Sequence, residues 1–474
     1  MNILYTTING EFFTIGKALL ELSYLVAAIF FVVGLKLLSH PESARRGNIW
    51  AASGMVLAMI STLFLHKTGA DGGISLTNGI IVAITILVGS ILGWTIAKRV
   101  KMTAMPQLVS FFNATGGAAS ALVALMEYPD VTGAGILVIT LLGLTIGSIS
   151  FSGSLIAYGK LDGKVGDIRA SYTKYINLLL LAVVIGLVVF LSVTGEMNLV
   201  LVYVLLVVSL LYGVLFVMPI GGADMPVVIS LLNSFTGIAA AMAGFIYGNQ
   251  AMILGGIFVG AAGSILTVLM CKAMNRSLLN VIIGAFGGGG AALSSDEGTI
   301  KEISLSDAGV LLNYSQKVVV VPGYGLAVAQ AQHLCHELDQ LLESNGVEVK
   351  YAIHPVAGRM PGHMNVLLAE ADVPYEKLIE MDDINPQLPS TDVVVVIGAN
   401  DTVNPAAEDD PSSPIHGMPI IKARTAKNII VMKRGMGKGY AGIENTLFFH
   451  DKTRMLFGNA KDSLQKLIEE IKNM

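Results

Sequence analysis

The chain has 474 residues, of which 53% are hydrophobic and only 14% charged, and its formal net charge is −4. A soluble domain of this size carries roughly a quarter charged residues, and the composition excludes disorder and collagen-like repeats. The two cysteines, Cys271 and Cys335, cannot form a framework of disulfides, and the net charge gives no sign of nucleic-acid binding.

Charge divides the chain into two unlike parts. Residues 1–272 contain 13 Lys or Arg and 10 Asp or Glu, whereas residues 273–474 contain 17 and 24. The density of charge is more than twofold higher in the second part. The first part is therefore predicted to be an α-helical polytopic membrane domain, and the second a water-soluble domain.

Nine stretches of the first part are long and apolar enough to cross a bilayer core, which needs about 20 residues per helix. They lie near residues 22–38, 48–65, 78–97, 105–126, 133–158, 175–193, 198–217, 225–247 and 251–271. No basic segment precedes the first apolar run, so we expect no cleavable signal. Residues 1–21 are expected to lie outside the bundle.

Loop charges orient the predicted bundle. With nine spans, the loops on the side of the C-terminal domain carry 11 Lys or Arg, and those on the other side carry 2. Because basic loops stay on the cytoplasmic side, we expect a cytoplasmic C-terminal domain and an external N-terminus. The predicted location is the bacterial inner (plasma) membrane.

An internal repeat joins two of the predicted spans. The segment from Met105 to Asn113, MPQLVSFFN, recurs 120 residues later as MPVVISLLN, from Met225 to Asn233. The two copies start the fourth and eighth spans, so they run in the same direction. This predicts a parallel three-helix repeat, spans 3–5 and 7–9, related by an axis along the membrane normal.

The repeat places Ser110 with Asn113, and Ser230 with Asn233, on one face of each helix. Polar side chains are costly in hydrocarbon without a partner, so two interpretations stay open: hydrogen bonds between helices, or a hydrated proton path. Asp224, just before the eighth span, is a candidate for that path, or simply an N-terminal cap.

The second part is predicted to begin with a flexible connector, residues 273–304, which contains four consecutive glycines. Residues 305–474 then alternate strands with helices, which favours an α/β parallel-sheet, Rossmann-like dinucleotide-binding domain. We expect a first helix around Leu305–Leu312, strands at 317–321, 347–353, 392–397 and 428–432, and helices at 326–344 and 459–472.

A glycine turn follows the first of these strands. Gly323, Gly325 and Val328 form a GxGxxV pattern between a strand and a helix, the setting of a dinucleotide-binding turn. Glycines there let the backbone approach a pyrophosphate closely. The pattern alone is weak, and an ordinary tight turn explains it equally well.

Basic residues near strand ends indicate which nicotinamide nucleotide would bind. An NAD site usually has an acid at the end of the second strand, and residues 352–355 contain none. Arg359 follows that strand, and Lys433 and Arg434 follow the strand at 428–432. An added 2′-phosphate favours such cations, although solvated surface charges would look the same. The glycine-rich stretch that ends at Tyr440 could close over a ligand.

Several strings together resemble the beta subunits of proton-translocating NAD(P)+ transhydrogenases, over the chain from about residue 22 onward. They begin at Gly221 (GGADMPVV), Cys271 (CKAMNRS), Pro322 (PGYGLAVAQAQ), His354 (HPVAGRMPGHMN) and Gly398 (GANDTVNP), with Lys433-Arg434 and the GYAG string at Gly439.

The resemblance implies hydride transfer between NAD(H), bound by a partner alpha subunit, and NADP(H), bound by this chain, coupled to proton translocation across the membrane. The alpha subunit would also supply further membrane helices, and two alpha–beta units would form a dimer. An alternative from another class is a transporter or channel regulated by an NADP(H)-sensing domain.

The resemblance also assigns residues. No side chain is catalytic, but Asp401 is expected near the nicotinamide, and no metal is expected. Lys433 and Arg434 would hold the 2′-phosphate, and Tyr440 belongs to a covering loop. The expected NADP(H)-binding residues are Gly323, Tyr324, Gly325, Val328, His354, Val356, Ala357, Gly358, Arg359, Met360, Pro361, Gly398, Ala399, Asn400, Asp401, Thr402, Gly417, Met418, Lys433, Arg434, Gly435, Met436, Gly437, Lys438, Gly439, Tyr440, Asn459 and Ala460; the expected proton path contains Asn113, Asp224, Ser230 and Asn233.

Two positions depart from the pattern of that family. Asn113 stands where some members carry a membrane histidine, and an amide cannot titrate, so the proton carrier would be another group, water or a histidine of the partner. Gly435 stands where a serine often follows the Lys-Arg pair, which removes one expected hydroxyl contact to the 2′-phosphate.

Overall fold

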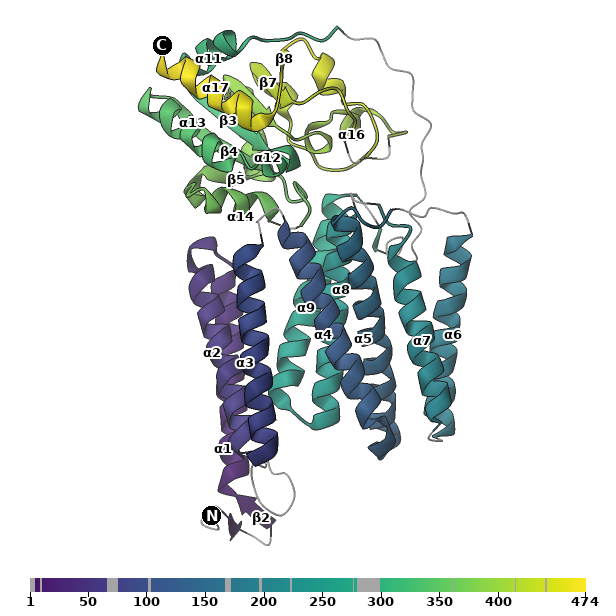
Figure 1. The fold of residues 1–474 in the computed structure, drawn as a ribbon. Helices are drawn as coiled ribbons and strands as arrows, with labels where there is room; N and C mark the ends of the chain where they lie inside the picture. The colour runs from purple at the N-terminus through teal and green to yellow at the C-terminus, as the bar shows by residue number, and fades with distance from the viewer. Residues whose placement is uncertain are drawn as a thin grey trace.

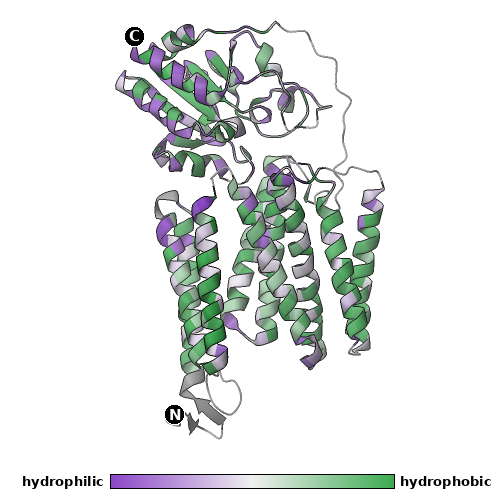
Figure 2. Ribbon diagram, viewed as in Figure 1, coloured by the Kyte–Doolittle hydropathy of each residue, from purple (hydrophilic) through white to green (hydrophobic). Residues whose placement is uncertain are grey.

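A computed structural model describes residues 5–8, 11–65, 76–100, 104–166, 172–195, 198–221, 224–275, 277–278, 299–360, 362–413, 415–439 and 441–474. It consists of a bundle of long helices with an α/β domain at one end, and the N-terminus lies at the opposite end of the bundle (Figure 1). Hydrophobic residues dominate the bundle, and hydrophilic residues gather in the α/β domain (Figure 2). Pro361, Tyr440 and most of the predicted connector lie outside the described residues.

Among the described residues, nine helices are long and apolar enough to cross a membrane, which confirms the predicted number. They are α1 (Ile15–Leu38), α2 (Pro41–Leu65), α3 (Leu76–Arg99), α4 (Met105–Glu127), α5 (Ala134–Leu161), α6 (Thr173–Thr194), α7 (Leu199–Val217), α8 (Met225–Tyr247) and α9 (Gln250–Ala273).

The first helix begins earlier than expected. An antiparallel hairpin, β1 (Tyr5–Ile8) and β2 (Glu11–Thr14), leads directly into α1 at Ile15, so the expectation that residues 1–21 lie outside the bundle is wrong for the last of them. Leu20 and Tyr24, four residues apart, are both buried. The apolar face of the helix therefore extends toward the N-terminus beyond residue 22.

The centre of the bundle consists of two tight hairpins, α4 with α5 and α8 with α9. A Cβ atom on Gly117 would lie 2.8 Å from the Gly147 carbonyl oxygen, and one on Gly237 would lie 2.5 Å from the Gly260 nitrogen. These glycines occupy matching positions of the sequence repeat, and small residues are what membrane helices use for close approach. The hairpins therefore share a packing mode, while the three-helix repeat and its axis stay a prediction.

The α/β domain contains a six-stranded sheet in which all neighbouring strands are parallel, in the order β5-β4-β3-β6-β7-β8. The strands are β3 (Lys317–Pro322), β4 (Glu348–Ile353), β5 (Leu378–Glu380), β6 (Val393–Ile397), β7 (Asn428–Lys433) and β8 (Thr453–Phe457). This is the strand order of the Rossmann fold and confirms the predicted fold class.

Helices cover both faces of the sheet. On one face lie α11 (Leu305–Asn313), α12 (Tyr324–Ala329), α13 (Gln332–Ser344), α14 (His363–Glu370) and α17 (Ala460–Lys472), and on the other α15 (Met381–Ile384) and several short turns; α16 (Ala406–Asp409) lies nearby. Strand residues alternate between the two cores: Val318 and Val320 face the first, Val319 and Val321 the second. Such all-apolar strands are typical of a sheet buried on both sides.

The sequence prediction differs from the structure in several elements, among them the short helices α14, α15 and α16, which were not expected. The helix expected at 326–344 is two helices, α12 and α13, because Gln330 adopts a left-handed conformation with φ of 50° and ends the first. Strands β5 and β8 were not expected. Among the described residues, the α/β domain also begins before residue 305, since Glu302 forms a parallel bridge with Met455.

Candidate functional site

Strands β3 and β6 are neighbours at the centre of the sheet. From β3 the chain adds β4 and β5 on one side, and from β6 it adds β7 and β8 on the other, so the strand order switches between β3 and β6. In open parallel sheets this point creates a crevice outside the carboxyl ends of the two strands, where dinucleotides bind. The turn with Gly323 and Gly325 follows β3, and Gly398 follows β6. The glycine turn therefore lies at the switch point.

These three glycines bring two loops into backbone contact. The Gly323 nitrogen donates to the Ile397 oxygen at 2.9 Å, and the Gly325 nitrogen donates to the Gly398 oxygen at 2.9 Å. A Cβ on Gly398, which has φ of +66°, would lie 2.4 Å from the Gly325 Cα. Loop packing therefore already requires the glycines, and Val328, the last position of the pattern, is exposed.

Two buried histidines hold the loop between β4 and α14. His354 Nδ1 accepts a hydrogen bond from the Val356 N–H at 3.2 Å, and its Nε2 lies 2.8 Å from the Pro419 carbonyl oxygen. His363 Nδ1 accepts from the Arg359 N–H at 3.1 Å. An Nδ1 that accepts carries no proton, so both rings are neutral with the proton on Nε2.

Burial keeps these rings neutral. It lowers the pKa of His354 to about 4, against the smaller opposing effects of the Pro419 carbonyl and Asp382. Burial also lowers the pKa of His363, and the positive charge of Arg359 adds to this. The loop geometry and the neutral form of both histidines therefore support each other.

We expect acid to loosen this loop. The folded-state pKa of His354 lies below its ordinary 6.5, so its contribution to stability is complete above pH 6.5 and is lost as the pH falls toward 4, on the order of 3 kcal/mol. The measurement is hydrogen-exchange protection of the Val356 and Arg359 amides in the full chain. The replacement His363→Asn keeps an acceptor but does not titrate.

In that variant the Arg359 amide should lose the pH dependence that arises from His363, while the Val356 amide, which depends on His354, should keep its own. Protection factors for both amides that do not change between pH 7 and pH 4.5 would contradict this role of the histidines.

Arg359 contacts both the glycine turn and the membrane bundle. Its guanidinium carbon lies 4.5 Å from the centre of the ring of Tyr324, which is the residue between Gly323 and Gly325. Its Nη1 donates to the Leu161 carbonyl oxygen at the end of α5, at 2.9 Å. A residue expected to bind nucleotide thus also joins the two domains.

The loop after β7 covers the loop after β6. The Ala441 N–H donates to Asp401 Oδ2 at 2.9 Å, and a Cβ on Gly439 would lie 2.3 Å from Asp401 Oδ1. Asn445 Nδ2 donates to the Asn400 oxygen at 2.9 Å. The glycine-rich stretch therefore lies directly against the residues expected beside the nicotinamide.

Two cations end β7. Lys433 Nζ lies 4.6 Å from the centre of the Phe448 ring, and burial lowers its pKa, with Asp401 opposing. Arg434 is exposed beside it. The Gly458 N–H donates to the Lys433 oxygen at 3.0 Å, which brings Asn459, the N-cap of α17, to the same edge.

Because all six strands of this sheet are parallel, most of the expected binding residues meet at its carboxyl edge. The β4 loop contributes His354, Val356, Ala357, Gly358, Arg359 and Met360, the β6 loop Gly398, Ala399, Asn400, Asp401 and Thr402, and the β7 loop Lys433, Arg434, Gly435, Met436, Gly437, Lys438 and Gly439. Met418 instead packs in a small separate cluster with Ile415 and Ile420. Sequence reasoning did not identify His363 or Asn445 as residues of the site. His363 lies within one of the strings that carry the resemblance, but no pattern marked Asn445.

This edge of the sheet lies against the bundle (Figure 1). Besides the Arg359 bond, Asn275 Nδ2, just after α9, donates to the His416 oxygen at 2.6 Å. Val356 packs on the apolar cluster at the end of the bundle that includes Leu161. The candidate nucleotide site therefore faces the membrane domain.

The polar membrane residues have defined contacts. Asn113 Nδ2 donates to the Ile229 oxygen on α8 at 3.4 Å, Ser110 Oγ to the Ser154 oxygen on α5 at 2.8 Å, and Ser230 Oγ to the Gly263 oxygen on α9 at 3.2 Å. Each of these three side chains therefore has a hydrogen-bond partner on another helix, and their place in a proton path stays a prediction. Asn233 is half-buried.

Asp224 is buried at the start of α8, on the side of the bundle that carries the α/β domain. Its side chain makes no capping hydrogen bond to the first turn of the helix. Asp224 therefore occupies the N-cap position of α8 without a side-chain capping hydrogen bond, and its part in a proton path stays a prediction.

Comparison with known proteins gives a consistent picture. Residues 20–470 match the model of the family described as NAD(P) transhydrogenase beta subunit. A protein of Rhodospirillum rubrum named NAD(P) transhydrogenase subunit beta is 46% identical over 461 residues, which cover 94% of this chain and 98% of the relative. The same name, identity and coverage hold for the protein of a defined strain of that species. The chain therefore belongs to the NAD(P) transhydrogenase beta subunit family, a membrane-spanning subunit of an oxidoreductase.

Proposed function

We propose that this chain binds NADP(H) at the carboxyl edge of its sheet and exchanges hydride with NAD(H) held by a partner alpha subunit, coupled to proton movement through the bundle. One observation carries the choice of nucleotide. Lys433 ends β7, the strand next to β6, and Arg434 follows it, whereas the end of β4 at Ile353 is followed by His354 rather than an acid. A 2′-phosphate favours the cations, and a free 2′-hydroxyl favours the acid.

The residues at the edge fit such a nucleotide. Gly323, Gly325 and Gly398 pack backbone against backbone, and in this proposal the two joined loops form the floor on which the pyrophosphate lies. The exposed guanidinium of Arg434 offers a planar fork for the 2′-phosphate. A Cβ on Gly435 would meet no atom within 4 Å, so the position where a serine often stands is open.

Hydride transfer requires little from the side chains, because the bound nicotinamide supplies the hydride chemistry and the protein positions it. In this proposal Asn400 and Asp401 line the nicotinamide end, and the loop with Gly439 closes over them. The Asp401 carboxylate, held by the Ala441 N–H at 2.9 Å, places a negative charge where it favours the positively charged oxidised ring.

The bundle supports a partner in the membrane. In α3, none of the residues is buried within this chain. The name of the family implies an alpha subunit, and we propose that its membrane helices complete the bundle and that two alpha–beta units form a dimer. With the basic loops on the side of the α/β domain, that domain is cytoplasmic and the membrane is the bacterial inner membrane.

Proton coupling in this proposal uses the end of the bundle below the α/β domain. Asp224 precedes α8 at this end, and Ser230 and Asn233 on α8, with Asn113 on α4, extend the polar residues inward. In the described contacts the nucleotide edge faces the bundle, so hydride exchange with a partner domain needs this contact to open. Protonation near Asp224 would shift the balance between docked and released positions.

Two measurements test the function itself. The purified chain should bind NADP+ in preference to NAD+, and membranes that contain it with its partner should reduce a thionicotinamide analogue of NADP+ with NADH. Equal affinity for the two nucleotides would overturn the assignment of the site. Preferential NADP+ binding without any hydride transfer would instead favour the transporter with a sensing domain.

The coupling is tested by Asn233→Leu. We expect this variant to bind NADP+ normally but to lose most NADH-driven proton movement in vesicles that contain a pH-sensitive dye, because a polar group of the path is replaced by hydrocarbon. Asn177→Leu is the matched control, since Asn177 on α6 is bonded to the Leu215 oxygen outside this path. Undiminished pumping by Asn233→Leu would refute the path.

A further inference from the structure

The carbonyl of Leu161 is shared between the two domains. It ends α5, and carbonyls at a helix C-terminus lack a partner within the helix and carry partial negative charge. It accepts from Arg359 Nη1 of the α/β domain at 2.9 Å and from Gln107 Nε2 at the start of α4 at 3.2 Å. One atom thus joins the nucleotide edge to the helix that carries Asn113.

Arg359 is held in place on its other side. Its guanidinium stacks on Tyr324 in the glycine turn at 4.5 Å, and its N–H is fixed by His363. The guanidinium therefore lies between the floor of the nucleotide site and the end of α5. A phosphate at this floor would lie beside the same cation that bonds the helix end.

We propose that Arg359 is a positioning residue that makes docking of the α/β domain on the bundle depend on nucleotide occupancy, an inference that rests on the proposed function. Without nucleotide, the guanidinium bonds the Leu161 carbonyl. With nucleotide, the phosphates take it, because a charge-assisted hydrogen bond to a phosphate is roughly twice as strong as one to a neutral acceptor. The anionic ligand also faces the negative end of α5, which favours release.

The second polar contact between the domains supplies a reporter. Asn275 Nδ2 lies 2.6 Å from the His416 oxygen, away from the guanidinium. Cysteines at positions 275 and 416, through Asn275→Cys and His416→Cys, would therefore be joined by a short bismaleimide only in the docked position. The buried native thiols, Cys271 and Cys335, are replaced by alanine in this reporter chain.

The experiment uses the reporter chain with its partner subunit in membrane vesicles. We expect strong cross-linking without nucleotide, a decrease on addition of NADP+, and little change with NAD+. In the reporter with Arg359→Gln the docked fraction should fall roughly tenfold without nucleotide, the scale of one charge-assisted hydrogen bond. Added NADP+ should then have no further effect.

Two variants complete the test. In this proposal Arg434 binds nucleotide but not Leu161. The variant Arg434→Gln should therefore cross-link like the parent without nucleotide and need more NADP+ for release. Arg359→Lys keeps the charge and should recover part of the docking, which separates this role from a general loss of structure.

Parent-like cross-linking by Arg359→Gln would overturn the proposal. The proposal would also be overturned if the parent binds NADP+ in equilibrium dialysis but cross-links equally or more strongly in the presence of NADP+ than in its absence. The proposed function would then stand. A parent that binds no NADP+ in the dialysis would overturn both.

Discussion

Replacement of Gly323 by alanine is expected to weaken NADP(H) binding strongly and to destabilise the α/β domain. A Cβ there would lie 2.3 Å from the Ala399 nitrogen and 2.5 Å from the Gly398 carbonyl carbon, and both are backbone atoms. Gly323 has φ of −125°, which alanine adopts freely, so the effect is steric. Relief would require the β3 and β6 loops to separate, which opens the floor of the site.

We expect a loss of at least roughly a hundredfold in NADP+ affinity and of about 3 kcal/mol in the free energy of unfolding, the upper range for overpacking. Equilibrium NADP+ binding and thermal unfolding of the detergent-solubilised protein are the measurements. Gly309→Ala is the control, because the nearest atom to a Cβ there is the flexible end of Met474 at 3.1 Å. Tight NADP+ binding by the Gly323 variant would show that the loops separate without cost.

Much of the architecture could be predicted because its signals are local. A membrane span is a long apolar run, and the ends of α4, α8 and α9 lie within a few residues of the expected positions. The buried strands β3, β6 and β7 are rich in valine and isoleucine and were found. Strand β5 has three residues, which are too few to show a pattern. The turn at Gln330 was not predicted because the apolar pattern of the sequence shows no break there.

The sequence predicted which strand ends and loops lie together at the candidate site, but not the contacts that hold them. The glycine turn after β3 is visible in the sequence, but the need for Gly323 comes from Ala399, which another strand brings to it. Asn113 finds its acceptor at Ile229 on a distant helix. The bond from Arg359 to Leu161 joins two domains, and neither partner carries a local mark of it.

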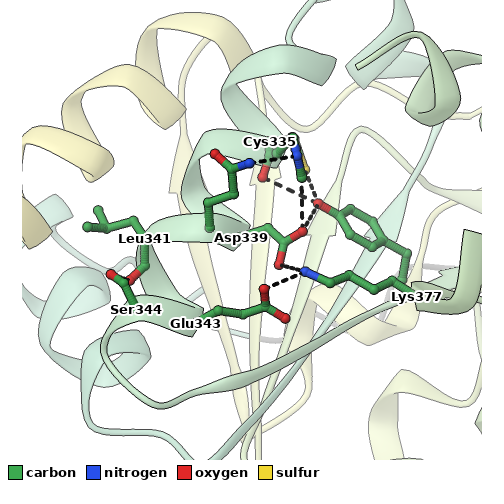
Figure 3. Close-up of polar contacts among 9 residues, drawn as sticks. Cys335, Asp339, Leu341, Glu343, Ser344 and Lys377 are labelled. Carbon is green, nitrogen blue, oxygen red and sulfur yellow. Dashed lines mark hydrogen bonds and ion pairs between the residues drawn. The ribbon is translucent and has the colours of Figure 1, made fainter. Parts of the chain in front are cut away.

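A second polar cluster lies on the same face of the sheet as α13, outside the nucleotide site (Figure 3). Asp339, which is 1% exposed, accepts from Lys377 Nζ at 2.8 Å and from the Tyr351 hydroxyl at 3.3 Å. Lys377 also pairs with Glu343 at 2.7 Å. Lys377 immediately precedes β5, so this cluster ties α13 to the short edge strand.

Replacement of Asp339 by alanine is expected to destabilise the α/β domain by about 2–3 kcal/mol, because the Tyr351 hydroxyl loses an acceptor and the Lys377 ammonium keeps only Glu343 as its partner. The double variant Asp339→Leu with Lys377→Met should recover most of this loss, since two apolar side chains of similar volume remove the desolvation cost of both charges. Thermal unfolding and hydrogen exchange of β5 in the full chain measure both variants. A double variant as unstable as the single one would contradict this explanation. It would show that the ion pair itself holds the edge strand and that this pair is net stabilising.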